Sequence, residues 1–106
     1  MINLKSSVKL DCITPQMTVG LIIAYSIFNR FELDMTVTSA NDSVHGKNSK
    51  HPKGDAIDIR TKDIQSRVTK FAIITLLKKA CDKQFDIVFE SEGKPQEHIH
   101  MEYDPK

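Results

Sequence analysis

A chain of 106 residues is long enough to bury one hydrophobic core without staples, so we expect a single domain spanning residues 1–106. Hydrophobic residues make up 40% of the chain and charged residues 27%, a composition that excludes a disordered or fibrous protein. Fifteen basic and fourteen acidic residues are mixed along the sequence, so no broad basic surface and no nucleic-acid partner are expected.

The first half of the chain predicts a helix and a strand, followed by a polar loop. Pro15 precedes apolar residues at helical spacing as far as Phe31, which predicts a helix with proline in its first turn. The alternating, β-branched residues 35–39 predict a strand. Residues 41–54 contain a single aliphatic side chain and indicate a loop, the kind of segment that often carries function.

The next segments predict a strand and a second helix. Residues 56–59 alternate so that the two isoleucines face the core and Asp58 faces the opposite side. Asp63 is the expected N-cap of a helix that continues to about Lys83. The residues at helical spacing within it are Ile64, Val68, Phe71, Ala72, Thr75, Leu76 and Lys79.

Two further strands complete the predicted sheet. Residues 85–89 and 98–103 read as strands, and residues 91–95 between them have the composition of a hairpin loop. The sequence therefore predicts an α+β architecture in which two helices pack on a small, largely antiparallel sheet.

No thiol-redox motif, secretion signal or membrane span is recognisable. Cys12 and Cys81 form no C-x-x-C pair, so we expect both to be buried small residues. The first residues lack the basic start and apolar run of a signal peptide, so we expect synthesis in the cytoplasm. The most apolar stretch, residues 19–28, is about half the length of roughly twenty residues that a membrane span needs.

All four histidines fall in two short segments. His45 and His51 lie in the predicted loop, and His98 and His100 lie in the last predicted strand. Zinc binds imidazole nitrogens and carboxylate oxygens, and a catalytic zinc ion uses three protein ligands. His51, Asp58 and His100 would supply such a set, whereas His45 is expected to be an exposed loop residue.

Local geometry is compatible with this ligand set. Gly54 permits a sharp turn after His51, so the following strand can return Asp58 toward the same place. His98 and His100 are two residues apart and share one face of their strand.

One segment matches a known signature at every fixed position. The residues Ser49, His51, Gly54, Ala56 and Asp58 fit the pattern S-x-H-x-x-G-x-A-x-D. The chain in this respect resembles the zinc D-alanyl-D-alanine carboxypeptidase family, which includes vancomycin-resistance dipeptidases and phage L-alanyl-D-glutamate endolysins. The family also has an acidic residue three positions before a ligating histidine, and Glu97 stands three before His100.

The resemblance implies a hedgehog-like zinc peptidase fold and one Zn²⁺ per chain. It implies His51, Asp58 and His100 as the metal ligands, Glu97 as the general base that activates water, and Ser49 in substrate binding. The implied activity is hydrolysis of peptide bonds in peptidoglycan stem peptides, of the D-Ala-D-Ala carboxypeptidase or L-Ala-D-Glu endopeptidase type. We expect a monomer that acts on the cell wall once it is released, as a phage lysis protein would.

The identity of the general base stays open. Residues three apart in an ideal strand point to opposite faces, so Glu97 can share the face of His100 only if the chain turns or bulges near Pro95. Glu90 is the alternative, because the zinc-bearing signalling domain of hedgehog proteins has a related fold and carries its site glutamate on the preceding strand.

Two positions depart from the family pattern. The family's S-G-Y-R segment corresponds to residues 39–42, which lack the arginine, so Arg60, Lys47 or Lys50 would have to replace it. His98 stands where the peptidases usually have tryptophan, and it is either a hydrogen-bond donor within the site or a strand-surface residue.

Two other functional classes compete with a peptidase. A non-catalytic zinc-binding recognition module of the same fold is favoured by the missing arginine and opposed by Glu97. A metal-free structural domain would require the five-position match to be a coincidence.

Overall fold

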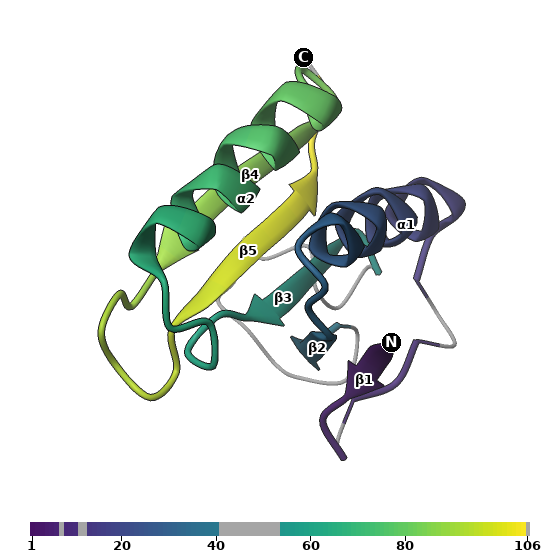
Figure 1. Cartoon of the computed structure of the whole chain (residues 1–106). Coiled ribbons are helices and arrows are strands. Elements are labelled where there is room, and N and C mark those ends of the chain that lie inside the picture. The colour runs from purple at the N-terminus through teal and green to yellow at the C-terminus, as the bar shows by residue number, and fades with distance from the viewer. Residues whose placement is uncertain (7, 11–12, 41–53, 106) are drawn as a thin grey trace.

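The computed structural model describes residues 1–6, 8–10, 13–40 and 54–105 (Figure 1). The elements follow in the order β1 (Ile2–Leu4), α1 (Pro15–Arg30), β2 (Met35–Ser39), β3 (Ala56–Arg60), α2 (Arg67–Cys81), β4 (Phe85–Glu90) and β5 (His98–Tyr103). Both predicted helices and all four predicted strands are present, which confirms the α+β class. β1 was not predicted, because three residues are too few to show a strand alternation.

The strands form one five-stranded sheet in the order β1-β2-β3-β5-β4. β1 pairs with β2 in parallel, and the other three pairs are antiparallel, as the sequence predicts. β4 and β5 form the expected hairpin. β3 lies at the centre of the sheet, so the residues that follow the polar loop are flanked by strands on both sides.

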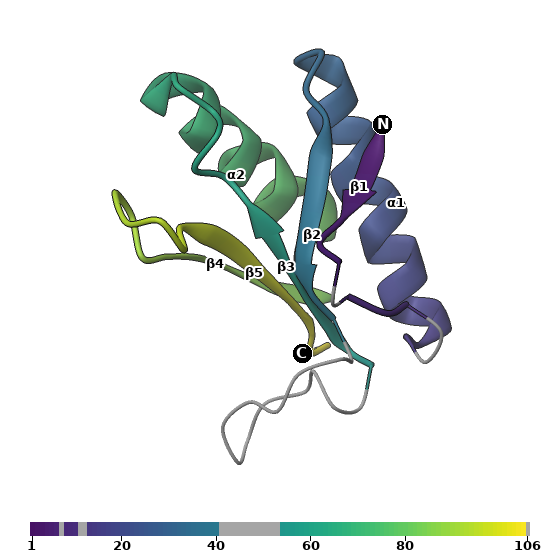
Figure 2. The same ribbon diagram turned by 90° about the horizontal axis from the view of Figure 1, so that it is seen from below.

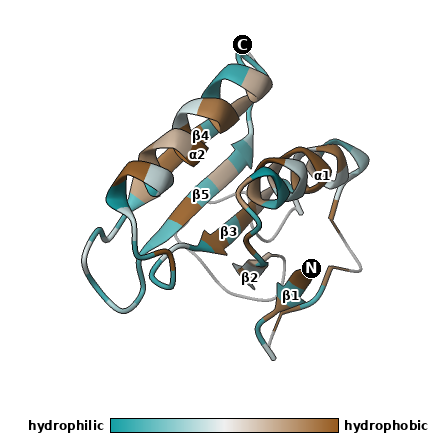
Figure 3. Cartoon of the chain, in the orientation of Figure 1, coloured by the Kyte–Doolittle hydropathy of each residue, from teal (hydrophilic) through white to brown (hydrophobic). Residues whose placement is uncertain are grey.

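Both helices cover the same face of the sheet, as Figures 1 and 2 show. The core lies between these two layers, and its fully buried side chains include Met17 and Phe28 of α1, Ile73 and Leu77 of α2, and Ile57, Ile59, Ile99 and Met101 of the strands. β5 alternates between hydrophilic and hydrophobic residues along its length (Figure 3). The strand residues that alternate with these core residues therefore point to the face of the sheet that the helices leave uncovered. We call this face the open face.

α1 begins where the sequence predicts. The Thr14 hydroxyl oxygen accepts a hydrogen bond from the Met17 N–H at 3.1 Å, and Pro15 occupies the first turn, where its missing N–H is not needed. The helix ends at Arg30, one residue before the expected end. Within the described residues, no helix combines the length and the apolar character that crossing a membrane requires.

α2 differs from the prediction in its start and in its buried face. Ser66, not Asp63, is the N-cap, since its hydroxyl oxygen accepts from the Thr69 N–H at 3.1 Å. Asp63 instead belongs to the turn after β3 and lies 3.7 Å from the Arg60 guanidinium. The buried side chains of α2 are Ile73, Ile74, Leu77 and Cys81, so the predicted face that included Val68 and Phe71 was wrong.

The misassigned face has a packing explanation. Val68 is 81% exposed, and Phe71 lies at the flank of the helix, where its ring contacts Phe89 edge to face with centroids 5.6 Å apart. The Arg67 guanidinium covers the same ring at 4.7 Å. Spacing identified one stripe of α2, and contact with the sheet buries a different one.

The start of β3 is held by two other elements. Gly54 has a φ of 78°, a left-handed conformation that glycine adopts without strain. Its carbonyl accepts from the Thr14 N–H at 3.0 Å, and the Thr14 hydroxyl donates to the Asp55 carboxylate at 2.6 Å. The Asp55 carbonyl accepts from the Tyr103 N–H at 2.8 Å. β3 therefore enters the sheet at a position fixed by α1 and β5.

Substituting Gly20 of α1 tests how tightly this helix packs on the sheet. A Cβ there would lie 2.7 Å from the Phe85 ring and 2.8 Å from the Met17 methyl group. Crowding of this kind costs about 1–3 kcal/mol, and the gain of about 1 kcal/mol in helix propensity offsets part of it. We expect Gly20→Ala to lower the free energy of unfolding by about 1 kcal/mol in denaturant titrations. The exposed Ser26→Ala variant is the matched control, and equal stability of the two variants would contradict close packing at Gly20.

Candidate metal centre

The open face of β3 and β5 carries the polar residues that the sequence predicts to be functional. Ile57 and Ile59 of β3 lie in the core, which leaves Asp58 on the opposite side. His98 and His100 alternate in the same way along β5. The antiparallel register places Asp58 directly across from His100, and Arg60 across from His98.

Asp58 and His100 are in direct contact. The Asp58 Oδ1 atom lies 2.8 Å from the His100 Nδ1 atom, although the residues are 42 positions apart in the sequence. Asp58 is only 9% exposed, and His100 is partly buried. The structure thus brings together two of the three predicted zinc ligands. The third, His51, lies outside the described residues, as do Ser49 and His45.

The His100 ring lies between two carboxylates. Its Nε2 atom is 3.1 Å from the Glu102 Oε1 atom, while Nδ1 contacts Asp58. The hydrogen bond with Asp58 raises the pKa of His100 to about 9, with a smaller contribution from Glu102 and against the opposing effect of burial. The contact of Nε2 with Glu102 orients the His100 ring so that Nδ1 faces the Asp58 carboxylate.

His98 connects this pair to a third carboxylate. Its Nδ1 donates to the Gln96 carbonyl at 2.8 Å, which assigns the hydrogen to that nitrogen because a carbonyl only accepts. Its Nε2 lies 3.2 Å from the Glu90 Oε1 atom and 3.8 Å from the Asp58 Oδ1 atom. The His98 ring is therefore oriented toward Asp58 and Glu90 and is not an isolated surface residue.

Glu97 occupies a different environment from the histidines. It has the parity of Ile99 and Met101, and its side chain is directed toward α2 and is 3% exposed as a residue. Oε1 accepts from the Thr61 hydroxyl at 2.7 Å and lies 2.8 Å from the Lys70 Nζ atom, and Oε2 accepts from the Gly93 N–H at 2.9 Å. Both carboxylate oxygens are therefore bonded to neighbours that join α2, the end of β3 and the β4–β5 loop.

The pKa of Glu97 reflects these bonds. Burial alone would raise the pKa of the carboxyl group, but the hydrogen bonds from Gly93, Lys70 and Thr61 outweigh burial and hold it below its usual value. Glu97 thus stays ionised as a structural anion. In an ideal strand, residues 97 and 100 point to opposite faces, and they do so here, because Glu97 is buried in alternation with His98 and His100.

Glu90, the alternative general base, lies on the open face. It is the register partner of His98 across the β4–β5 pair, and its side chain is 47% exposed. Its Oε1 atom lies 3.2 Å from the His98 Nε2 atom. Glu90 therefore combines access to solvent with proximity to the Asp58 and His100 pair, through His98.

The donor set at Asp58 and His100 fits zinc, which accepts a carboxylate oxygen together with imidazole nitrogens.

A second acidic group on the open face was not predicted. Within the described part of the chain, ligand atoms of Asp86, Glu102 and Asp104 lie within 4.8 Å of one another. Sequence could have indicated this group, because Glu102 and Asp104 are two residues apart and Asp86 lies near the start of the neighbouring predicted strand. An all-oxygen donor set suits harder cations than zinc.

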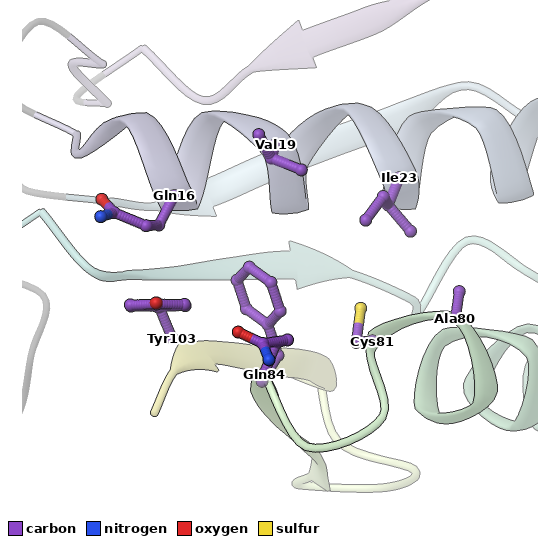
Figure 4. Close-up of a pocket in the computed structure, with 8 residues that line it drawn as sticks. Gln16, Val19, Ile23, Ala80, Cys81, Gln84 and Tyr103 are labelled. Atoms are coloured by element: carbon purple, nitrogen blue, oxygen red, sulfur yellow. The ribbon is translucent and has the colours of Figure 1, made fainter. Parts of the chain in front are cut away.

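A separate apolar groove lies on the helix-covered side of the sheet. It has a volume of about 230 Å³ and contains none of the predicted site residues. Figure 4 shows Gln16, Val19 and Ile23 of α1 on one side of it, opposite Cys81, Gln84 and Tyr103.

Cys81 is buried, as predicted, and burial raises the pKa of its thiol, so the sulfur is not an activated nucleophile. Cys12 lies outside the described residues.

The pKa of His100 makes a prediction for the metal-free protein. Because the folded-state pKa is raised from about 6.5 to about 9, the charged pair with Asp58 stabilises the fold fully below pH 6.5 and loses its effect as the pH rises through 9. In chelator-treated protein we expect the His100 ring to titrate near pH 9 in NMR spectra, and near its ordinary value in Asp58→Asn. Glu92→Gln, an exposed acidic variant, should leave the titration unchanged. An ordinary pKa in the unsubstituted protein would contradict the ion pair.

Comparison with known proteins does not extend the assignment beyond the sequence signature and the geometry. No family model matches the chain, and no curated protein matches it. The functional interpretation therefore depends on the five-position signature and on the pairing of Asp58 with His100.

Proposed function

We propose that the chain is a zinc-dependent peptidase that hydrolyses peptide bonds in peptidoglycan stem peptides. The observation that carries the proposal is the contact between Asp58 and His100 on the open face, at 2.8 Å. The family resemblance implies both residues as zinc ligands, Asp58 through the five-position signature and His100 through the acidic residue three positions before it. Two ligands that are remote in sequence and adjacent in space are what a metal centre requires, and a surface histidine chosen at random would not meet this condition.

The proposed ligands of one zinc ion are His51, Asp58 and His100. Zinc in such a site supplies Lewis-acid chemistry, which polarises a carbonyl group and makes water a better nucleophile at neutral pH. Glu102 contacts Nε2 of the His100 ring. A carboxylate on one ring nitrogen of a histidine orients the ring and increases the basicity of the other nitrogen.

We assign the general base to Glu90 rather than Glu97. A general base needs a free oxygen that can reach the reacting water. Glu97 has both oxygens bonded on the helix side of the sheet, whereas Glu90 is solvent-accessible on the open face. His98 lies between Glu90 and Asp58, so its Nε2 can exchange a proton with Glu90 or, when protonated, donate to a developing oxyanion.

A recognition module with the same metal site is the second candidate function. The observation that favours it is the bonding of Glu97, since the acidic residue that resembles the family's base is held by Lys70, Thr61 and Gly93. The two functions differ in one measurable property, which is whether a zinc-loaded protein cleaves a peptide.

Zinc binding tests the ligand assignment directly. We expect His51→Ala, Asp58→Ala and His100→Ala each to abolish tight zinc binding, because a catalytic zinc site has only three protein ligands. Metal content is measured by mass spectrometry after dialysis against a weak chelator. Asp86→Asn is the matched control from the acidic group and should keep one zinc per chain. Full zinc content in Asp58→Ala, or loss of zinc only in Asp86→Asn, would place the metal elsewhere.

The choice of base is tested by comparing Glu90→Gln with Glu97→Gln in the zinc-loaded protein. Purified peptidoglycan fragments are incubated with each protein, and the products are identified by mass spectrometry. Glu90→Gln should lower turnover about 10²–10⁴-fold at unchanged zinc content and stability. Glu97→Gln should keep turnover within about tenfold well below its melting temperature but lower the free energy of unfolding by about 1–3 kcal/mol, because the charge of Lys70 loses its buried partner.

The outcomes separate the candidate functions. Full activity of Glu90→Gln together with an inactive but folded Glu97→Gln would return the base to Glu97. If the unsubstituted protein binds zinc and cleaves no fragment, the peptidase proposal fails and the recognition module becomes the better account.

A further inference from the structure

A hollow of about 330 Å³ opens beside the candidate metal centre. Its wall includes Asp58 and His98, so it is continuous with the site. The remaining lining residues are Lys5, Thr38, Arg60, Lys62, Pro95, Gln96 and Glu97. Three of these are cationic, although the chain as a whole carries a net charge of only +1.

The three cationic residues come from separate parts of the chain. Lys5 follows β1, and its N–H donates to the Val37 carbonyl of β2 at 3.0 Å, which fixes its backbone at that edge of the hollow. Arg60 is the last residue of β3 and the register partner of His98. Lys62 follows two residues later, in the turn that leads to α2. Pairing of β1, β2 and β3 therefore collects these side chains at one place.

Positive charge in the hollow is not balanced by its acidic residues. Asp58 is paired with His100, and Glu97 is paired with Lys70. The Lys5 and Lys62 ammonium groups form no ion pair with any described residue, and Arg60 has only Asp63, at 3.7 Å. A concave surface that holds three cations against two neutralised carboxylates concentrates positive potential and attracts anions.

We propose that Lys5, Arg60 and Lys62 form a subsite that binds a carboxylate group of the peptide substrate next to the bond to be cleaved, an inference that rests on the proposed function. Arginine binds a carboxylate through two parallel hydrogen bonds, and lysine adds point charge. The hollow shares Asp58 and His98 with the metal centre, so a carboxylate bound there belongs to a residue adjoining the scissile bond. That carboxylate is either the C-terminus of the peptide or an acidic side chain.

Binding of matched peptides to the zinc-loaded protein tests the subsite. The probes are N-acetyl-D-alanyl-D-alanine and N-acetyl-L-alanyl-D-glutamate, each compared with the form in which its carboxyl groups are amidated. We expect at least one acid to bind about tenfold more tightly than its amide in calorimetric titrations, a preference that declines as salt is added. The probe that shows the preference identifies the carboxylate as terminal or side-chain.

The double variant Arg60→Gln/Lys62→Gln should lose this preference. Arg30→Gln/Lys94→Gln removes the same number and kind of charges at exposed positions outside the hollow, and it should retain the preference. Equal binding of acids and amides by the unsubstituted protein, or equal loss of preference in both double variants, would overturn the proposal.

The subsite and the peptidase function fail separately. Carboxylate-dependent binding without cleavage of any stem peptide would refute the peptidase and leave the subsite in place. Cleavage of acid and amide substrates at equal rates, unchanged in Arg60→Gln/Lys62→Gln, would refute the subsite and leave the peptidase in place.

Discussion

The antiparallel pairing of β3 with β5 is the interaction on which the candidate centre depends. Its register places Asp58 across from His100 and Arg60 across from His98, so one ladder of backbone hydrogen bonds positions four side chains of the candidate site and its hollow. A slip of one residue would turn Asp58 into the core and bring Ile57 or Ile59 to the open face. The four core residues of these strands, Ile57, Ile59, Ile99 and Met101, oppose that slip, because their burial under the helices would be lost.

The two faces of the sheet divide the acidic residues into different roles. On the helix side, Glu97 accepts hydrogen bonds from three partners and neutralises Lys70 where water is excluded. A buried anion of this kind stabilises the fold only while it keeps its partners. On the open face, Glu90 and Glu102 stay accessible beside histidines. The same residue type is structural on one face and chemically available on the other, and strand parity determines which.

Charge is arranged asymmetrically around the centre. Carboxylates contact both ring nitrogens of His100 and favour its cationic form. If His100 held a metal ion, binding would release a proton from this ring. The adjoining hollow has the opposite character, because Lys5 and Lys62 face it without acidic partners among the described residues. If the proposed function holds, a candidate metal site rich in carboxylates beside a cationic pocket would suit a peptide that carries a carboxylate near its scissile bond.

The sequence by itself determined the features that depend on residues close together in the chain. Alternation and helical spacing predicted α1, β2, β3, β4 and β5. The family resemblance predicted Asp58 and His100 as ligands, and these roles stay predictions, as do those of His51 and Ser49, which lie outside the described residues. Periodicity predicted the wrong buried face of α2, and Asp63 rather than Ser66 as its N-cap. Only the tertiary structure placed Glu90 on the open face and Glu97 on the helix side, and brought Lys5 and Arg60 to the same hollow. These relations arise from pairing and burial between segments that are remote in sequence.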